Sequence, residues 1–162
     1  MDVRRATRDD AGDIRRIAEA SWREAYGGVL RSETIDAAMT EWYDVDGIEA
    51  SLKRDDVHTF VAEIDDETVG FATGGPRERD EALLARLYVE PEHWGDGIGT
   101  ALLDRVIESL RADGFERLSL SVLAENEVGR AFYESRGFET RERVSDDLFG
   151  EQVTDLELVL EI

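Results

Sequence analysis

The order in which strand-like and helix-like hydrophobic patterns follow one another constrains the fold of this chain most strongly. Residues 3–6 have the pattern of a short strand, and apolar side chains then recur at helical spacing from Ala11 to the pair Gly27-Gly28. A second helical stretch covers residues 32–42, and residues 48–52 predict a further short turn of helix. The first third of the chain is therefore predicted to be mostly helical.

Strand patterns dominate the rest of the chain. His58–Ile64 and Thr68–Gly74 flank the turn Asp65-Asp66-Glu67 and predict a hairpin, and Ala82–Val89 predicts a third strand. After these we expect a helix that a glycine-rich turn opens and Gly114 ends, a strand at 118–122, a helix through Tyr133 ended by Gly137, and strands near 138–143 and 153–160.

The predicted order is β-α-α-β-β-β-α-β-α-β-β. Early hairpins and late helical crossovers predict an α/β fold in which a mixed sheet is covered by helices. The chain has 162 residues and contains no internal repeat, linker or low-complexity segment. Residues 1–162 are therefore expected to form a single domain.

The segment Gly95-Asp96-Gly97-Ile98-Gly99, between a predicted strand and an amphipathic helix, is the strongest chemical signal. Glycines let the backbone approach a ligand, and free amides at a helix start favour a phosphate or pyrophosphate. The lysine of a P-loop is missing, and the glycine spacing does not fit the dinucleotide fingerprint. A pyrophosphate-binding loop and a tight turn without a ligand both remain open.

A second cluster lies on the helix that follows Asn126, which carries Arg130, Phe132 and Tyr133 before Gly137-Phe138. Tyr133 lies about 100° round the helix from Phe132, so its hydroxyl need not point into the same core. A phenol that faces a cleft and a half-buried core tyrosine both fit this position.

Together these motifs resemble those of the GNAT superfamily of N-acetyltransferases. Residues 91–103 resemble its acetyl-CoA signature, and Asn-x6-Tyr-x3-Gly-Phe from Asn126 resembles its following motif. Arg5-Ala6-Thr7-x-x-Asp10 resembles its opening, and Leu87-Tyr88-Val89-x-Pro91 resembles its central strand. The resemblance covers nearly the whole chain and implies a mostly antiparallel sheet of six to seven strands covered by about four helices.

The resemblance also implies a reaction: direct transfer of the acetyl group of acetyl-CoA, the cofactor, to a primary amine of a small molecule or a protein N-terminus. Tyr133 would be the general acid that protonates the leaving thiolate, and a strand amide near Val89 would stabilise the oxyanion. The implied cofactor-binding residues are Leu87, Tyr88, Val89, Gly95, Asp96, Gly97, Ile98, Gly99, Thr100, Asn126 and Arg130.

Some positions depart from the family's pattern. Trp94 stands where the signature begins with arginine or glutamine, and Asp96 places a negative charge beside the expected pyrophosphate. The glutamates that many relatives carry align here with Leu83 and Ser121. Glu81, two residues from Leu83 on the same strand face, is therefore the candidate catalytic base, and a water chain is the alternative.

Residues 21–27 resemble a first-helix segment that walls the acceptor site in some GNAT enzymes. Trp22 and Tyr26 are four residues apart and share a helix face, which makes both candidate substrate-binding residues. Core packing fits Trp22 as well. Because the usual glutamates are missing, a catalytically silent CoA-binding sensor or interaction module is the alternative function, and a phosphate-binding domain of another kind is the third.

The composition excludes several classes of protein. No cysteine is present, which excludes a disulfide framework, a thiolate zinc cluster and a cysteine nucleophile. The two histidines are isolated and Asp146-Asp147 is interpreted as a solvated loop, so no metal site is predicted. With 39 acidic and 19 basic residues the net charge is −20, which disfavours nucleic acid, and no apolar run is long enough to span a membrane.

The excess of acidic residues indicates the solvent in which the protein is expected to work. The acids are scattered rather than gathered in a tail, and Lys53 is the one lysine among 19 basic residues. At 1 M salt the Debye length falls to about 3 Å, which screens self-repulsion while carboxylates keep the surface hydrated. We therefore expect a halophilic, cytoplasmic monomer or homodimer without a secretory signal, because no apolar stretch follows Met1–Arg5.

Overall fold

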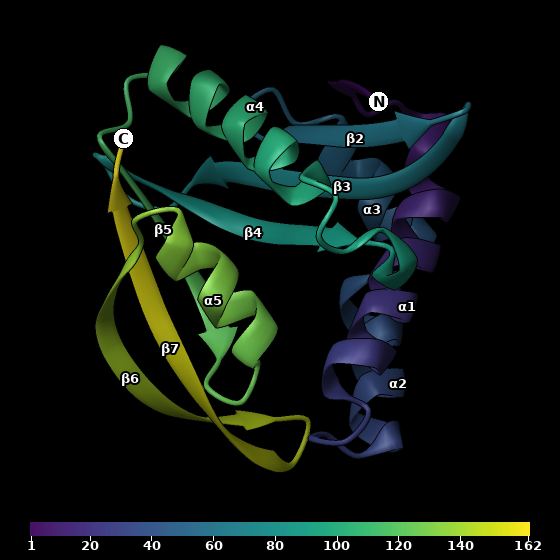
Figure 1. The fold of residues 1–162 in the computed structure, drawn as a ribbon, viewed down its shortest axis with the longest axis vertical. Helices are drawn as coiled ribbons and strands as arrows, with labels where there is room; N and C mark the ends of the chain where they lie inside the picture. The colour runs from purple at the N-terminus through teal and green to yellow at the C-terminus, as the bar shows by residue number, and fades with distance from the viewer.

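The computed structural model describes residues 1–162 as one seven-stranded sheet with helices on both faces (Figure 1). The strands lie in the order β1-β2-β3-β4-β5-β7-β6, and all neighbours are antiparallel except β4 and β5. Their bounds are β1 Asp2–Arg5, β2 His58–Ile64, β3 Glu67–Pro76, β4 Glu81–Val89, β5 Arg117–Leu123, β6 Glu139–Leu148 and β7 Glu151–Glu161. The mixed, mostly antiparallel sheet is therefore confirmed.

The sheet opens at its one parallel pair. Glu81–Leu83 of β4 pairs with Arg117–Ser119 of β5, and beyond this short ladder the two strands diverge, as Figure 1 shows. β4 stays paired with β3 as far as Val89, and β5 stays paired with β7 as far as Leu123. Each diverging strand therefore presents one unpaired edge to the opening.

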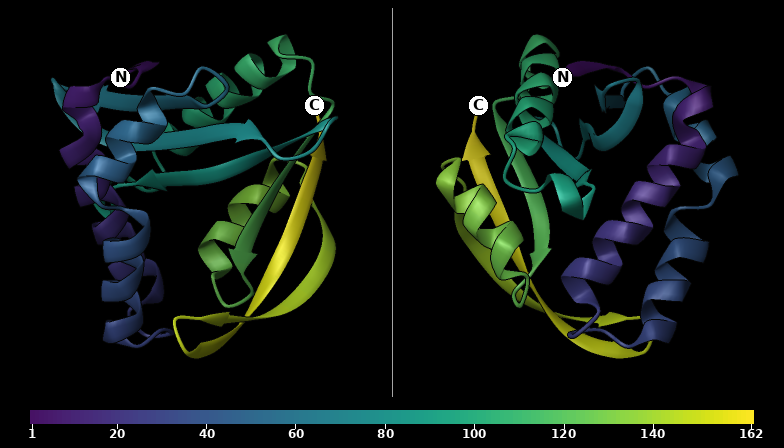
Figure 2. Two further views of the ribbon diagram at one scale, coloured as in Figure 1. Left: turned by 180° about the vertical axis from the view of Figure 1, so that it is seen from behind. Right: turned by 45° about the vertical axis from the view of Figure 1, so that its right-hand side comes forward.

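Five α-helices lie on the two faces of the sheet (Figure 2). One face carries α1 Ala11–Tyr26, α2 Ser32–Trp42 and α3 Val45–Leu52, and the other carries α4 Ile98–Ala112 and α5 Glu127–Ser135. Short 3-10 turns precede α1 at Arg8–Asp10 and α4 at Pro91–His93. None of the helices combines the length and the apolar character needed to cross a membrane.

Strand alternation divides the apolar residues between two cores. Phe60 of β2 packs in the core beneath α4 with Leu102, whereas its neighbour Val61 joins the core beneath α1 with Ile17 and Phe71. Successive strand residues point to opposite faces, so one sheet holds both helical layers. Each fully buried side chain of this size contributes roughly 1.5–3 kcal/mol relative to exposure, which fixes the layers that flank the opening.

The predicted order of elements is confirmed in outline, with two differences. The short turn expected at 48–52 is the end of α3, whose start is capped by Asp44, which accepts a hydrogen bond from the Gly47 amide at 3.1 Å. β6 extends to Leu148, so the interpretation of Asp146-Asp147 as a solvated loop was wrong. Pairing with β7, which sets Asp146 opposite Val153, supplies the ladder that the local sequence did not indicate.

Candidate active site

A cleft of about 400 Å³ lies where β4 and β5 diverge. Its walls are the outer half of β4, the loop before α4, the first turn of α4, the end of β5, α5 and part of α1. None of its 24 lining residues is acidic, and Arg86 carries its one permanent charge, although 39 of the 162 residues are acidic. The cleft is therefore suited to an anionic ligand.

The end of β4 is fixed through the carbonyl oxygen of Val89. The Ser21 hydroxyl of α1 donates a hydrogen bond to it at 2.9 Å, and the Trp94 indole N–H donates another at 2.7 Å. Trp94 thus ties the glycine-rich loop to the strand. The sequence showed only that Trp94 replaces the arginine or glutamine at this position and did not indicate this role. Leu87, Tyr88 and Val89 line the cleft on the unpaired edge of β4, as strand-like binding of an extended ligand requires.

The glycine-rich loop leaves the start of α4 open to a ligand. Gly95 and Gly97 have φ values of +88° and +82°, in the left-handed region that glycine adopts without strain. Gly97 is the N-cap of α4 and no side chain caps the helix, so its first amides are free to bind an anion. Ile98, Gly99 and Thr100 continue the cleft wall along the first turn.

Asn126 joins α5 to α1 at the edge of the cleft. Its Oδ1 accepts a hydrogen bond from the Gly129 amide at 2.9 Å and so caps α5. Its Nδ2 donates to the Tyr26 hydroxyl at 3.1 Å. One side chain therefore sets the start of the helix and holds a tyrosine of the opposite layer, and both residues line the cleft.

Tyr133 faces the cleft from α5. Its ring packs edge-on against Phe132 and Phe138, with ring centres 5.3 and 5.5 Å away. Burial raises the pKa of the Tyr133 phenol, with smaller contributions from Tyr88 and Tyr26, and no hydrogen bond within the chain opposes that shift. The phenol is therefore protonated at neutral pH and has its proton free to donate.

Comparison with known proteins agrees with this geometry. Residues 14–138, which hold both the glycine-rich loop and the Asn126–Tyr133 motif, match the model of the acetyltransferase (GNAT) family. The chain belongs to the GNAT family. It is thus an acetyl-CoA-dependent acyltransferase, and acetyl-CoA is its cofactor. The acid-free cleft and the uncapped start of α4 fit the anionic coenzyme.

Three relatives place the chain within GNAT proteins. An uncharacterized N-acetyltransferase of Methanocaldococcus jannaschii is 30% identical over 148 residues, which are 88% of this chain and 62% of that protein. The spermidine N(1)-acetyltransferase of Thermoplasma acidophilum is 26% identical over 156 residues, 94% of this chain and 96% of the relative. The solved PaiA N-acetyltransferase of T. acidophilum in complex with coenzyme A has a TM-score of 0.86 at 25% identity and covers 99% of this chain and 98% of its own.

Substituting Gly97 tests the GNAT loop. Gly97→Ala forces an L side chain into the left-handed region at a cost of about 1–2 kcal/mol, and relief of that strain tilts the first amides of α4. We expect the Kd for CoA, measured by calorimetry, to rise about tenfold. Gly114→Ala is the matched control, because Gly114 has φ +95° at the other end of α4. Gly114→Ala should lower stability as much as Gly97→Ala does and leave the Kd for CoA at the wild-type value. The same Kd for CoA in the two variants would contradict the assignment of the loop.

The structure places Glu81, the candidate base, outside the cleft. Glu81 is 4% exposed, and its carboxylate receives two hydrogen bonds from Arg141, at 2.6 and 2.8 Å. Arg77 and Arg117 lie 3.7 Å away. Arg141 foremost, then a hydrogen bond from Ser119 and the charge of Arg77, lower the pKa of Glu81 to about 2 against the opposing effect of burial, so Glu81 is a poor proton acceptor. We therefore withdraw Glu81 as the base.

Two predicted cofactor-binding residues also lie outside the cleft lining. Asp96 is exposed, and its carboxylate lies 3.7 Å from Nδ1 of His93. Arg130 turns its guanidinium back to the carbonyl of Ala124, to which it donates a hydrogen bond at 2.9 Å. In this conformation Arg130 braces the loop before α5 rather than reaching into the cleft.

The two aromatic residues predicted for the acceptor site separate. Tyr26 lines the main cleft and also a neighbouring cavity, whereas Trp22 lines only the second. Their rings meet edge-on with centres 5.1 Å apart, and Trp22 is 6% exposed. Trp22 is thus both a core residue and a wall of the neighbouring cavity.

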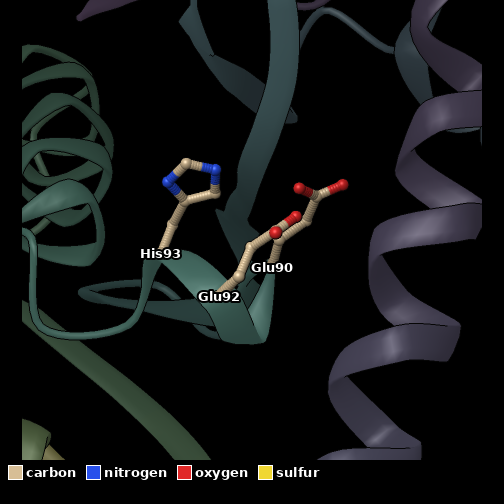
Figure 3. Close-up of side chains that lie close together, drawn as sticks. All are labelled: Glu90, Glu92 and His93. Carbon is tan, nitrogen blue, oxygen red and sulfur yellow. The ribbon is translucent and has the colours of Figure 1, made fainter.

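Glu90, Glu92 and His93 gather on the turn before α4 (Figure 3). Their potential ligand atoms lie within 4.8 Å of one another, and the close-up shows the three side chains projecting from one side of the turn. The carboxylate of Glu90, however, is hydrogen-bonded to Arg16. That ion pair ties the start of the turn to α1, and of the three residues only His93 lines the cleft.

Proposed function

We propose that the chain transfers an acetyl group directly to a primary amine of a small molecule, with Tyr133 as the general acid. Acetyl-CoA, when bound, supplies a thioester that a neutral amine attacks. The observation that carries the proposal is the Tyr133 phenol, which lies in the cleft, protonated and without a partner in the chain. A phenol so placed donates its proton to the leaving sulfur.

Backbone groups hold the coenzyme in this proposal. The first amides of α4, from Ile98 to Thr100, bind the pyrophosphate, and the free edge of β4 from Leu87 to Val89 holds the extended arm. A strand amide near Val89 stabilises negative charge on the carbonyl oxygen during attack. The fixed carbonyl of Val89 keeps that edge rigid, so these donors are in place before the reaction.

No carboxylate lines the cleft, so the proton of the acceptor ammonium leaves through water. The spermidine acetyltransferase of T. acidophilum supports an aliphatic amine as acceptor.

Release of free CoA tests the proposal. Purified protein, acetyl-CoA and a panel of aliphatic amines, amino acids and peptide N-termini are mixed in about 1 M KCl, and new thiol is measured against hydrolysis without amine. We expect release above that background with at least one aliphatic amine. Release no faster than hydrolysis across the whole panel would reject acetyl transfer to amines of these classes.

A catalytically silent CoA-binding module is the second candidate, and the absence of a carboxylate base from the cleft lining favours it. Calorimetry separates the two functions. CoA binding without turnover, unchanged in Tyr133→Phe, would support the silent module, whereas turnover that depends on Tyr133 supports the enzyme.

We also infer that the protein works in a salt-rich cytoplasm, because a net charge of −20 on 162 residues repels itself when unscreened. Thermal unfolding followed by circular dichroism should give a Tm that falls as KCl is reduced from about 2 M to about 50 mM. NaCl at equal ionic strength should restore the Tm equally if screening is the cause. A Tm that is constant across the series would contradict this inference.

A further inference from the structure

A second cavity, of about 310 Å³, adjoins the main cleft on the side of α1, α2, β6 and β7. The two cavities share five lining residues, among them Tyr26, Tyr88 and Ser121. A molecule that extends from the thioester end of the cleft toward the acceptor side therefore enters this second cavity. Its chemistry decides which acceptors fit.

Aromatic rings form much of the second cavity. Trp22 lies edge-on to Trp42, with ring centres 6.0 Å apart, and to Tyr43 at 6.3 Å. Trp22 is 6% exposed, and its indole N–H lies near the hydroxyls of Tyr43 and Tyr88. Such rings exclude water from methylene chains and attract cations to their faces.

Two carboxylates complete the cavity. Asp155, half-buried on β7, and Asp146, exposed on β6, both line it, and they lie beside one another across the β6–β7 ladder. Burial raises the pKa of Asp155, and the neighbouring Asp146 raises it further, with no basic group acting against them. The nearby carboxylates Glu151 and Glu157 each pair with an arginine, whereas these two do not.

Arg86 is the one cation among the lining residues, and it is already engaged. Its Nη2 donates a hydrogen bond to the Trp42 carbonyl at 2.7 Å, and its guanidinium carbon lies 4.6 Å from the centre of the Tyr43 ring. Arg86 is therefore held by Trp42 and Tyr43, and it forms no ion pair with Asp155 or Asp146. The acidic charge that is absent from the cofactor cleft is present in the adjoining cavity.

We propose that the second cavity binds the distal ammonium of a diamine or polyamine acceptor, with Asp155 and Asp146 as counter-charges. The near amine of the same molecule then lies toward the cleft, and the methylene chain contacts Trp22 and Trp42. The acceptor class is an aliphatic amine with a second positive charge, in preference to a monoamine or a peptide N-terminus. This assignment rests on the proposed acetyl transfer and adds the residues that select the acceptor.

Kinetics with a matched substrate pair test the assignment. We expect kcat/KM for 1,4-diaminobutane to exceed that for butylamine by about tenfold to a hundredfold, the range expected for charge-assisted hydrogen bonds. Asp155→Asn should bring the two values to within about threefold, mainly through KM for the diamine, and Asp146→Asn should act in the same direction. Asp147→Asn is the matched control, because Asp147 is the exposed neighbour outside the cavity lining.

Equal kcat/KM values for the two amines in the wild type, a better peptide N-terminus, or an equal loss in Asp147→Asn would overturn the assignment. Calorimetric titration of 1,4-diaminobutane into the CoA-saturated protein separates it from the proposed function. Diamine binding that Asp155→Asn abolishes, without any turnover, would reject acetyl transfer and support the ammonium site. Turnover of amines without a diamine preference would support acetyl transfer and reject the ammonium site.

Discussion

Tyr133→Phe should lower kcat by about 10²–10⁴-fold, the usual contribution of a positioned general acid. The substitution removes one oxygen and keeps the ring that packs against Phe132 and Phe138. Without the phenol hydroxyl, the leaving thiolate has no fixed proton donor on the α5 side of the cleft. The Kd for CoA should stay within about twofold, because the main-chain groups of α4 and β4 carry that binding.

Ser135→Ala provides the control for this experiment. Ser135 lies on the same helix, and its hydroxyl donates to the Phe132 carbonyl at 2.6 Å on the exposed side. Removing that hydroxyl should leave kcat unchanged. Steady-state kinetics in molar KCl and calorimetry with CoA measure both quantities. A kcat for Tyr133→Phe within about threefold of the wild type would remove Tyr133 from the role of acid.

The elements that carry this site were predictable where local spacing decides the structure. The glycines of the loop predict the left-handed turn at Gly95 and Gly97, because only glycine adopts such a turn at no steric cost. The segment from Asn126 to Gly137 predicts a helix, but its spacing fits a Tyr133 in the core as well as one at the cleft, and the structure places it at the cleft. The turn and the helix depend on a few neighbouring residues, so the sequence alone contains them.

The sequence-based predictions failed where the structure brings together segments that are distant in the chain. Glu81 was chosen because alternation sets it on the face of Leu83, but its partner Arg141 comes from a strand 60 residues later in the chain. Likewise, Asp155 and Asp146 gain their place in the second cavity only when β6 and β7 fold across the end of α1. No local pattern contains a contact of that range, although the long β-rich end of the chain indicated that such strands exist.

Glu81→Gln should destabilise the fold by about 3 kcal/mol. Glu81 has a pKa of about 2 in the folded chain against an ordinary value of 4.5, and one pKa unit corresponds to 1.36 kcal/mol. The lowered pKa means that the stabilisation is present above the ordinary value and is lost as the pH falls from about 5 to about 2. Denaturant unfolding at pH 7 should therefore separate the variant from the wild type, and the difference should shrink on acidification.

The same charge change at Glu161 is the control, since Glu161 is exposed on the neighbouring part of β7 opposite Arg117. Glu161→Gln should change the free energy of unfolding by less than about 0.5 kcal/mol. Folded Glu81→Gln should keep the kcat of the wild type, because its carboxylate lies outside the cleft. If kcat instead falls while stability is unchanged, Glu81 acts in proton transfer. Arg141, Arg77 and Arg117 would then set the pKa of a catalytic base rather than stabilise the paired ends of β4 and β5.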